Sequence, residues 1–122
     1  MSVKVIAHYE KGWFDDPRTD RRLYDHLTRC FADTSLQMIS GWDEADTEGK
    51  TVVLLDEQGV ESLTAFKHPE NACYVVGRTG QNNLLTDIKH DVSVRIATPN
   101  NISMFGSTVI AMTLWDRWTK EQ

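Results

Sequence analysis

One uninterrupted apolar run constrains the fold of this chain more than any other feature. Residues 51–55 read Thr-Val-Val-Leu-Leu, and polar segments flank the run on both sides. Such a run is typical of a strand covered on both faces, as in the middle of a parallel sheet. Residues 3–8, 35–39, 73–76 and 92–96 also contain short β-branched or apolar runs, so we predict five strands.

Two helical patterns accompany the predicted strands. Asp16 before Pro17 is a helix-start signal, and the helix is predicted to continue to about Ala32. Its expected apolar side comprises Leu23, Leu27, Cys30 and Phe31, and its basic side comprises Arg18, Arg22, His26 and Arg29. From Ser103 to about Lys120, apolar residues cover more than one helical stripe, so this helix is expected to be buried on two sides. Residues 59–66 are expected to form no more than a helical turn.

Strands separated by helical patterns predict an α/β fold with a parallel sheet and helices on its faces. In open sheets of this kind, ligands bind beyond the carboxyl ends of the strands. Three loops are predicted there: one after Leu55, one after Val76 and one after Ile96. We expect them to form a single pocket.

Composition limits what the chain can be. With 122 residues it is expected to be a single domain, residues 1–122, and short enough that an oligomer would help its stability. The formal net charge of -5 argues against binding nucleic acid by overall charge, so an RNA partner would need a local basic patch. The short length also predicts no appended RNA-binding domain.

Cys30 and Cys73 are far apart and lack zinc-site spacing, so both are predicted to be reduced core thiols. No apolar run approaches the roughly 20 residues that span a bilayer, and the N-terminus lacks a secretory signal pattern. These features predict a cytoplasmic protein without membrane contact.

Two segments carry a resemblance to a known family. Residues 66–77 read Phe-Lys-His-Pro-Glu-Asn-Ala-Cys-Tyr-Val-Val-Gly, a His-Pro pair before a strand that ends in Gly. Residues 96–118 contain a strand end, a Pro-containing loop, Ser103-Met104 and a helix that ends in Trp115 and Trp118. From about Thr51 onward the chain resembles the SPOUT superfamily of knotted RNA methyltransferases, especially the branch that methylates ribose 2′-oxygens.

The resemblance implies a trefoil knot with the C-terminal helix threaded through a loop, a homodimer formed through that helix, and S-adenosylmethionine bound in the knotted loops. No metal is implied, because the sulfonium methyl group transfers by direct displacement. The implied cofactor-binding residues are Leu55, Val76, Gly77, Gly80, Ile96, Thr98, Pro99, Met104 and Phe105. The implied catalytic residues are Arg22 or Arg29, which we cannot align uniquely, and Ser103, which is also a candidate helix N-cap.

Departures from the family pattern leave other interpretations open. Gly77-Arg78-Thr79-Gly80 lacks the family's Glu, and Phe105 stands where the motif has Asn. The alternatives are a catalytically degenerate dimer that binds or regulates, and a flavodoxin-like ligand-binding domain, whose last helix would have one polar face.

Several single residues have two interpretations each. Each Arg of the first helix either contacts RNA phosphates or belongs to a solvated helix face. Trp13 and Trp42 either stack on bases or cover the core. His8, near the predicted pocket, is either satisfied locally or catalytic. His68 is interpreted as a residue that shapes the turn before Pro69, with a catalytic role as the alternative.

Overall fold

The computed structural model describes residues 2–8, 17–76, 88–100 and 104–122. The strands are β1 (Val3–His8), β2 (Thr34–Ile39), β3 (Thr51–Leu55), β4 (Glu61–Ser62), β5 (Ala72–Val76) and β6 (Val92–Arg95). The α-helices are α1 (Pro17–Arg29) and α2 (Gly106–Lys120), and two short 3-10 helices are η1 (Trp42–Glu44) and η2 (Leu63–Ala65).

The strands form one parallel sheet in the order β2-β1-β5-β3-β6-β4. This confirms the predicted α/β fold. The apolar run at residues 51–55 is β3, and β5 lies between β1 and β3 with all five of its residues buried. The predicted turn at 59–66 contains the two-residue strand β4 and the helix η2.

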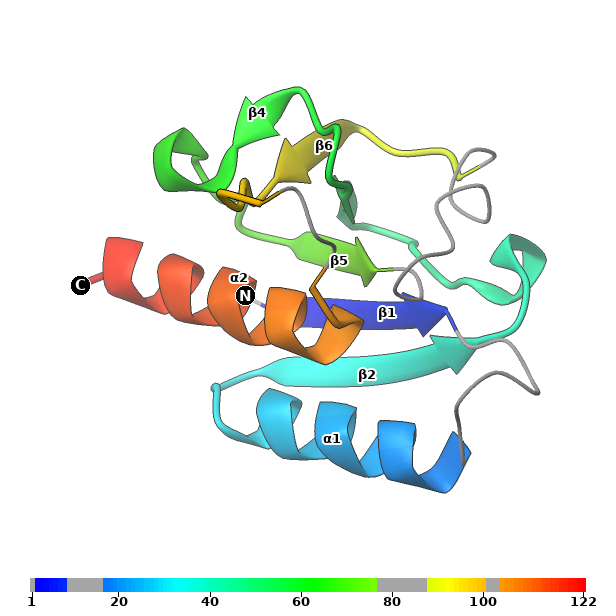
Figure 1. Ribbon diagram of the computed structural model, residues 1–122. Coiled ribbons are helices and arrows are strands. Elements are labelled where there is room, and N and C mark those ends of the chain that lie inside the picture. Colours follow the sequence, from blue (N-terminus) through cyan, green and yellow to red (C-terminus); the bar gives the residue numbers. More distant parts are fainter. Residues whose placement is uncertain (1, 9–16, 77–87, 101–103) are drawn as a thin grey trace.

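Both described α-helices cover the same face of the sheet (Figure 1). The core on this face combines strand residues such as Val5 and Tyr74 with Tyr24 of α1 and Ile110 and Leu114 of α2. The opposite face is a second cluster, made of Ile6, Ile39, Val52, Leu54, Cys73, Val75 and Ile88. Trp42 and Ala45 pack against that second cluster, so Trp42 covers the core.

The helices run opposite to the strands, so the helix N-termini lie toward the carboxyl ends of the strands (Figure 1). The carboxyl-end edge of the sheet and the start of α2 therefore lie on the same side of the molecule. The C-terminal end of α2 lies at the opposite edge.

Helix α1 ends at Arg29, three residues before the predicted end at Ala32. Its last turn tightens, because the amides of Cys30 and Phe31 donate to carbonyls three residues earlier, at 3.1 and 3.3 Å. Asp33 then adopts a φ of 54°, in the left-handed region that a helix cannot contain. The amide of Val3 donates to the Asp33 carbonyl at 2.9 Å, which ties this turn to the start of β1.

The predicted apolar side of α1 was wrong in part. Leu23 is 48% exposed and Cys30 is exposed, whereas Tyr24 and Thr28 are buried. The buried stripe is thus centred about 100° away from Leu23, one residue along the helix. The core-thiol prediction is confirmed for Cys73, which is free and fully buried, and burial raises the pKa of this thiol to about 11.

Helix α2 begins at Gly106, not at Ser103, and its N-cap is Phe105, whose side chain makes no capping hydrogen bond. Its sheet-facing side contains Gly106, Ile110, Thr113, Leu114 and Arg117. The other side is open in the single chain: Phe105 is 63%, Trp115 59% and Trp118 50% exposed. Burial on two sides, as predicted, would require a further molecule.

Two cations, the buried Arg117 and the exposed Lys120, hold the C-terminal half of α2 to residues 63–70. The Arg117 guanidinium donates to the carbonyl of Pro69 at 2.6 Å and that of Glu70 at 3.0 Å. Lys120 donates to the carbonyls of Leu63 and Phe66 at 2.7 and 2.9 Å. These cations bind carbonyls of η2 and of the turn after it, and the Leu63 carbonyl also accepts from the amide of Phe66 at 3.1 Å.

Candidate functional site

The parallel register brings the predicted strand ends together. Leu55 pairs with Val76 and with Val94, and Val76 also pairs with Ala7 of β1. Ile96 follows β6 directly, is half-buried and packs against the same core. The carboxyl ends of β1, β5, β3 and β6 thus form one continuous edge, as the sequence predicted.

Not every predicted residue presents its side chain at this edge. Leu55 and Val76 are buried in the core, so a ligand would meet their backbone and not their side chains. Thr98 is half-buried, whereas Pro99 is exposed. Gly77, Gly80 and Ser103 lie outside the described residues.

The turn after β3, residues 56–60, is tightly fixed on β6. The amide of Asp56 donates to the Val94 carbonyl at 3.0 Å, and the amide of Gly59 donates to the Asp56 carbonyl at 2.9 Å. The amide of Val60 donates to the Ser93 hydroxyl at 3.0 Å. One wall of the edge is therefore a rigid turn.

Arg95, the last residue of β6, completes this arrangement, and sequence reasoning missed it. Its Nη1 donates to the carbonyls of Gly59 at 3.0 Å and Val60 at 2.8 Å. The side chain thereby joins two of the three predicted ligand-binding segments. The available signal was an Arg in a strand that otherwise alternates apolar residues, directly before the predicted loop.

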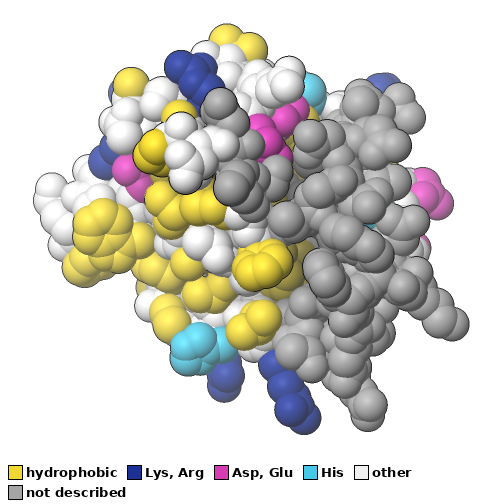
Figure 2. Space-filling model, viewed as in Figure 1, with side chains coloured by type: hydrophobic (Ala, Val, Ile, Leu, Met, Phe, Trp, Pro, Cys, Tyr) yellow, Lys and Arg dark blue, Asp and Glu magenta, His cyan; other side chains and the backbone are white. Residues whose placement is uncertain are grey.

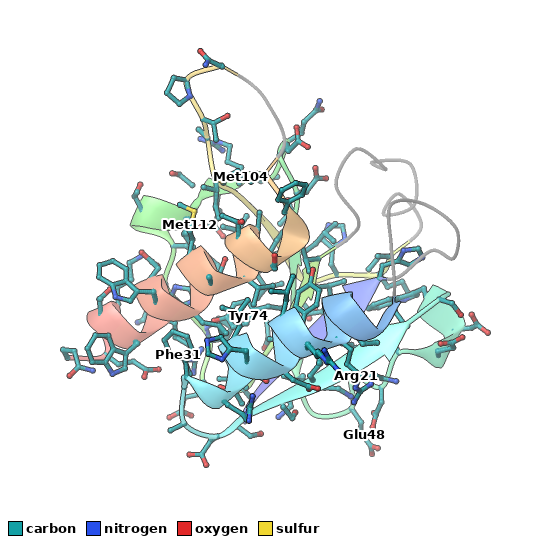
Figure 3. The ribbon with its side chains drawn as sticks, turned by 60° about the horizontal axis from the view of Figure 1, so that its bottom comes forward. Arg21, Phe31, Glu48, Tyr74, Met104 and Met112 are labelled. Carbon is teal, nitrogen blue, oxygen red and sulfur yellow. The ribbon has the colours of Figure 1, made fainter. Side chains whose placement is uncertain are left out.

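The segment that leads into α2 lies on the same side of the molecule. Met104 is half-buried and lies near the start of α2, on the side away from α1 (Figure 3). Phe105 is mostly exposed, so its ring is available at the surface instead of filling the core. Ile96 and Met104 are thus two half-buried apolar residues among those implied to bind the cofactor.

His8 ends β1 at this edge. Its Nδ1 is buried and has no hydrogen-bond partner in the part of the chain that the structure describes. By strand alternation its side chain shares a face with Ile6, the face of the second core cluster.

The basic residues of α1 form an exposed stripe. Arg22, His26 and Arg29 are all exposed, as is Arg21, which forms an ion pair with Asp25 at 3.6 Å. Figure 3 shows Arg21 on the side of α1 that faces away from α2. Because α1 starts at the carboxyl-end edge, Arg22 lies about 10 Å closer to that edge than Arg29, at 1.5 Å per residue.

Within the described ranges, no group of three His, Cys, Asp or Glu side chains is arranged to hold a metal ion. A helix with the length and apolar character needed to cross a membrane is likewise not found in those ranges.

A comparison with known proteins shows that the fold of this chain is similar to that of a solved structure. Neither the scan against protein-family models nor the search of curated proteins found a match. A solved structure described as "Structural insights into the 2-OH methylation of C/U34 on tRNA" superposes with a TM-score of 0.66 at 10% identity. The match covers 98% of this chain and 91% of that chain. This chain therefore has the same fold as that solved structure. The predicted resemblance is thus confirmed for the fold.

We predict that replacement by Ala destabilises the protein more at Gly59, in the turn after β3, than at Gly41. A Cβ at Gly59 would lie 2.5 Å from the carbonyl carbon of Val94 and 2.7 Å from its nitrogen, backbone atoms of β6 that cannot yield. We expect Gly59→Ala to lower the free energy of unfolding by about 2–3 kcal/mol in urea denaturation. At Gly41 the short contact is to the flexible Asp43 carboxylate, so Gly41→Ala should cost about 1 kcal/mol or less. Equal losses in the two variants would contradict the close packing of the turn on β6.

Proposed function

We propose that the chain is a single-domain RNA methyltransferase that uses S-adenosylmethionine and methylates a ribose 2′-oxygen. The observation that carries the proposal is the fold likeness, over nearly the whole chain, to a protein studied for tRNA 2-OH methylation. In support, the strands that precede the predicted cofactor segments end at one edge of the sheet. A knotted path for the C-terminal helix and a cytoplasmic location belong to this proposal.

The residues at the carboxyl-end edge suit an adenosine ligand. Half-buried Ile96 and Met104 offer apolar surface, and the strand ends at Leu55 and Val76 offer backbone groups. Arg95 and Gly59 would keep the turn after β3 in place, so the pocket is partly organised before a ligand binds. When bound, the cofactor would supply an electrophilic methyl group. Gly77, Gly80, Thr98, Pro99 and Phe105 complete the proposed cofactor site, with Ser103 as its polar residue.

The proposed acceptor surface is the basic stripe of α1. An exposed guanidinium binds a phosphate through two parallel hydrogen bonds, and a stripe of them would offset the net negative charge of the chain locally. Of the two catalytic candidates we favour Arg22, because it lies nearer the carboxyl-end edge than Arg29. The proposed role of Arg22 is to orient or deprotonate the acceptor hydroxyl.

A homodimer through α2 is the proposed assembly. Figure 2 shows hydrophobic side chains gathered on the molecular face that α2 occupies. The large exposed apolar residues there are Phe105, Met112, Trp115 and Trp118. A monomer rarely leaves several large apolar side chains in water on one helix, and a second copy of α2 would cover them.

A second candidate function rests on Phe105. This ring is exposed at the start of α2 and supplies no amide to hold a cofactor or a ribose, unlike the Asn of the family motif. The alternative is a catalytically degenerate dimer that binds RNA or a partner without transferring a methyl group.

The cofactor proposal predicts binding in calorimetric titration. S-adenosylmethionine and S-adenosylhomocysteine should each bind once per subunit, at micromolar concentration. Met104→Ala should weaken binding about tenfold, which corresponds to about 1.4 kcal/mol of lost contact. Met112→Ala, the same change on the outward side of α2, should leave the affinity unchanged. Absence of binding to the unaltered protein by either compound would refute the cofactor site.

The acceptor proposal predicts that Arg18, Arg22 and Arg29, replaced together by Ala, lose affinity for unfractionated tRNA. The salt dependence of binding should also decrease, because fewer counterions are released, while cofactor affinity stays constant. Lys67 and Lys89 are exposed cations outside α1, so their double replacement by Ala serves as the control. An unchanged tRNA affinity in the Arg variant would remove α1 from the acceptor surface.

The assembly proposal is tested by sedimentation. The unaltered chain should sediment at twice the 13.9 kDa subunit mass, and Trp115→Glu with Trp118→Glu should sediment as a monomer. Val60→Glu changes an exposed apolar residue outside α2 and should leave the dimer intact. A monomeric unaltered protein would contradict the dimer.

A further inference from the structure

His68 sits at the centre of a buried polar cluster that the proposed function does not use. Its side chain is only 4% exposed, and it lies between β5 and the C-terminal half of α2. Nδ1 is 2.6 Å from the Tyr74 hydroxyl and Nε2 is 2.7 Å from Oδ2 of Asp116. The ring also makes edge-on contacts with Phe66 and Tyr74, with centroids 5.0 and 5.7 Å apart.

The hydrogen bonds in this cluster are complete when the His68 ring is neutral. The Asp116 carboxylate can only accept, so Nε2–H of His68 donates to it. Nδ1 is then the acceptor and takes the hydroxyl hydrogen of Tyr74. The Tyr74 oxygen in turn accepts from Nη1 of Arg117 at 3.1 Å. Each of these hydrogen bonds therefore joins one donor to one acceptor.

A second proton on the His68 ring would disrupt this series of hydrogen bonds. Nδ1 would become a donor, and the Tyr74 hydroxyl hydrogen would have to turn away from it. Tyr74 is fully buried, and its oxygen already accepts from Arg117, so that hydrogen would lose its partner in the core. Protonation therefore leaves one buried donor unsatisfied.

The surrounding charges have opposing effects on the protonation of His68. Asp116 attracts an imidazolium, but it already pairs with Lys120 at 2.7 Å. Arg117 and Lys120 of α2 repel an imidazolium, and Arg117 pairs with Glu121 at 3.1 Å. On its own segment, the side chains of Lys67 and Glu70 are exposed. Burial lowers the pKa of His68 below its usual 6.5, and the hydrogen bond and charge of Asp116 only partly offset this.

We propose that His68 is a proton-sensitive latch that holds the C-terminal half of α2 on residues 63–70 and releases it on acidification. The latch acts through Asp116, Arg117 and Lys120, and the last two donate to the backbone carbonyls of residues 63, 66, 69 and 70. The outward side of the same helix turns carries Trp115 and Trp118. Release would therefore alter the proposed dimer surface without touching the carboxyl-end edge.

The pH range follows from the direction of the pKa shift. The folded state binds the proton less readily than the unfolded chain, so the latch contributes its full stability above pH 6.5. That contribution is lost progressively as the pH falls below 6.5, until the folded-state pKa is also passed.

Amide hydrogen exchange tests the latch without relying on methyl transfer. After correction for intrinsic rates, protection of residues 113–120 should fall, by at most about tenfold, between about pH 7.5 and about pH 5.5. His68→Gln keeps one amide donor for Asp116 and one carbonyl acceptor for Tyr74 but cannot titrate, so its protection should be independent of pH. His90→Gln, at an exposed histidine, should behave as the unaltered protein does.

A second measurement needs no variant and covers the case in which His68→Gln does not fold. An NMR titration of the histidine ring protons in the unaltered protein should give His68 a midpoint below 6.5. The amide shifts of residues 113–120 should change with the same midpoint. A His68 midpoint at or above 6.5, or the same pH-dependent loss of protection in His68→Gln, would overturn the proposal.

Discussion

The parallel pairing of β5 with both β1 and β3 is the constraint on which the rest of the structure depends. Because neighbouring strands point the same way, every connection must cross back over the sheet, and the loops that follow the strands collect at one edge. Helices α1 and α2 both lie on one face and begin at that edge. The proposed cofactor residues and the basic stripe of α1 come from distant parts of the sequence, yet this pairing places them on one side of the molecule.

Helix α2 links two regions with different chemistry. Its start lies beside the carboxyl-end edge, where Ile96 and Met104 offer half-buried apolar surface. Its end is fixed at the opposite edge by Arg117 and Lys120, which bind backbone carbonyls of residues 63–70. Burying a guanidinium is unfavourable unless its donors are paired, and here three bonds and the Glu121 carboxylate pair them. The helix is thus anchored by polar contacts at one end while its outward Trp side chains stay available for assembly.

The sequence predicted the strands and the fold class well, because continuous β-branched runs such as residues 51–55 have few alternatives to a buried strand. It also predicted that Leu55, Val76 and Ile96 share one edge. Prediction from the sequence failed where the burial of a side chain depends on residues that are distant in the sequence. Arg117 can be buried because the carbonyls of residues 69 and 70 accept its hydrogen bonds. Arg95 donates to carbonyls of a turn more than thirty residues earlier in the sequence. On α1 the prediction was right for Leu27 and Phe31, which pack against the core, but it included the exposed Leu23 and Cys30 and missed the buried Tyr24 and Thr28. The roles of Arg22, Ser103 and the glycine loop stay predictions.

Ribose methylation with S-adenosylmethionine can be measured by the transfer of a labelled methyl group to RNA. The protein is incubated with methyl-tritiated S-adenosylmethionine and unfractionated cellular RNA, and the RNA is digested to nucleosides and separated. If the protein methylates ribose, the label will elute with 2′-O-methylated nucleosides. Label on a base, or no label from a protein that binds the cofactor, would contradict ribose methylation.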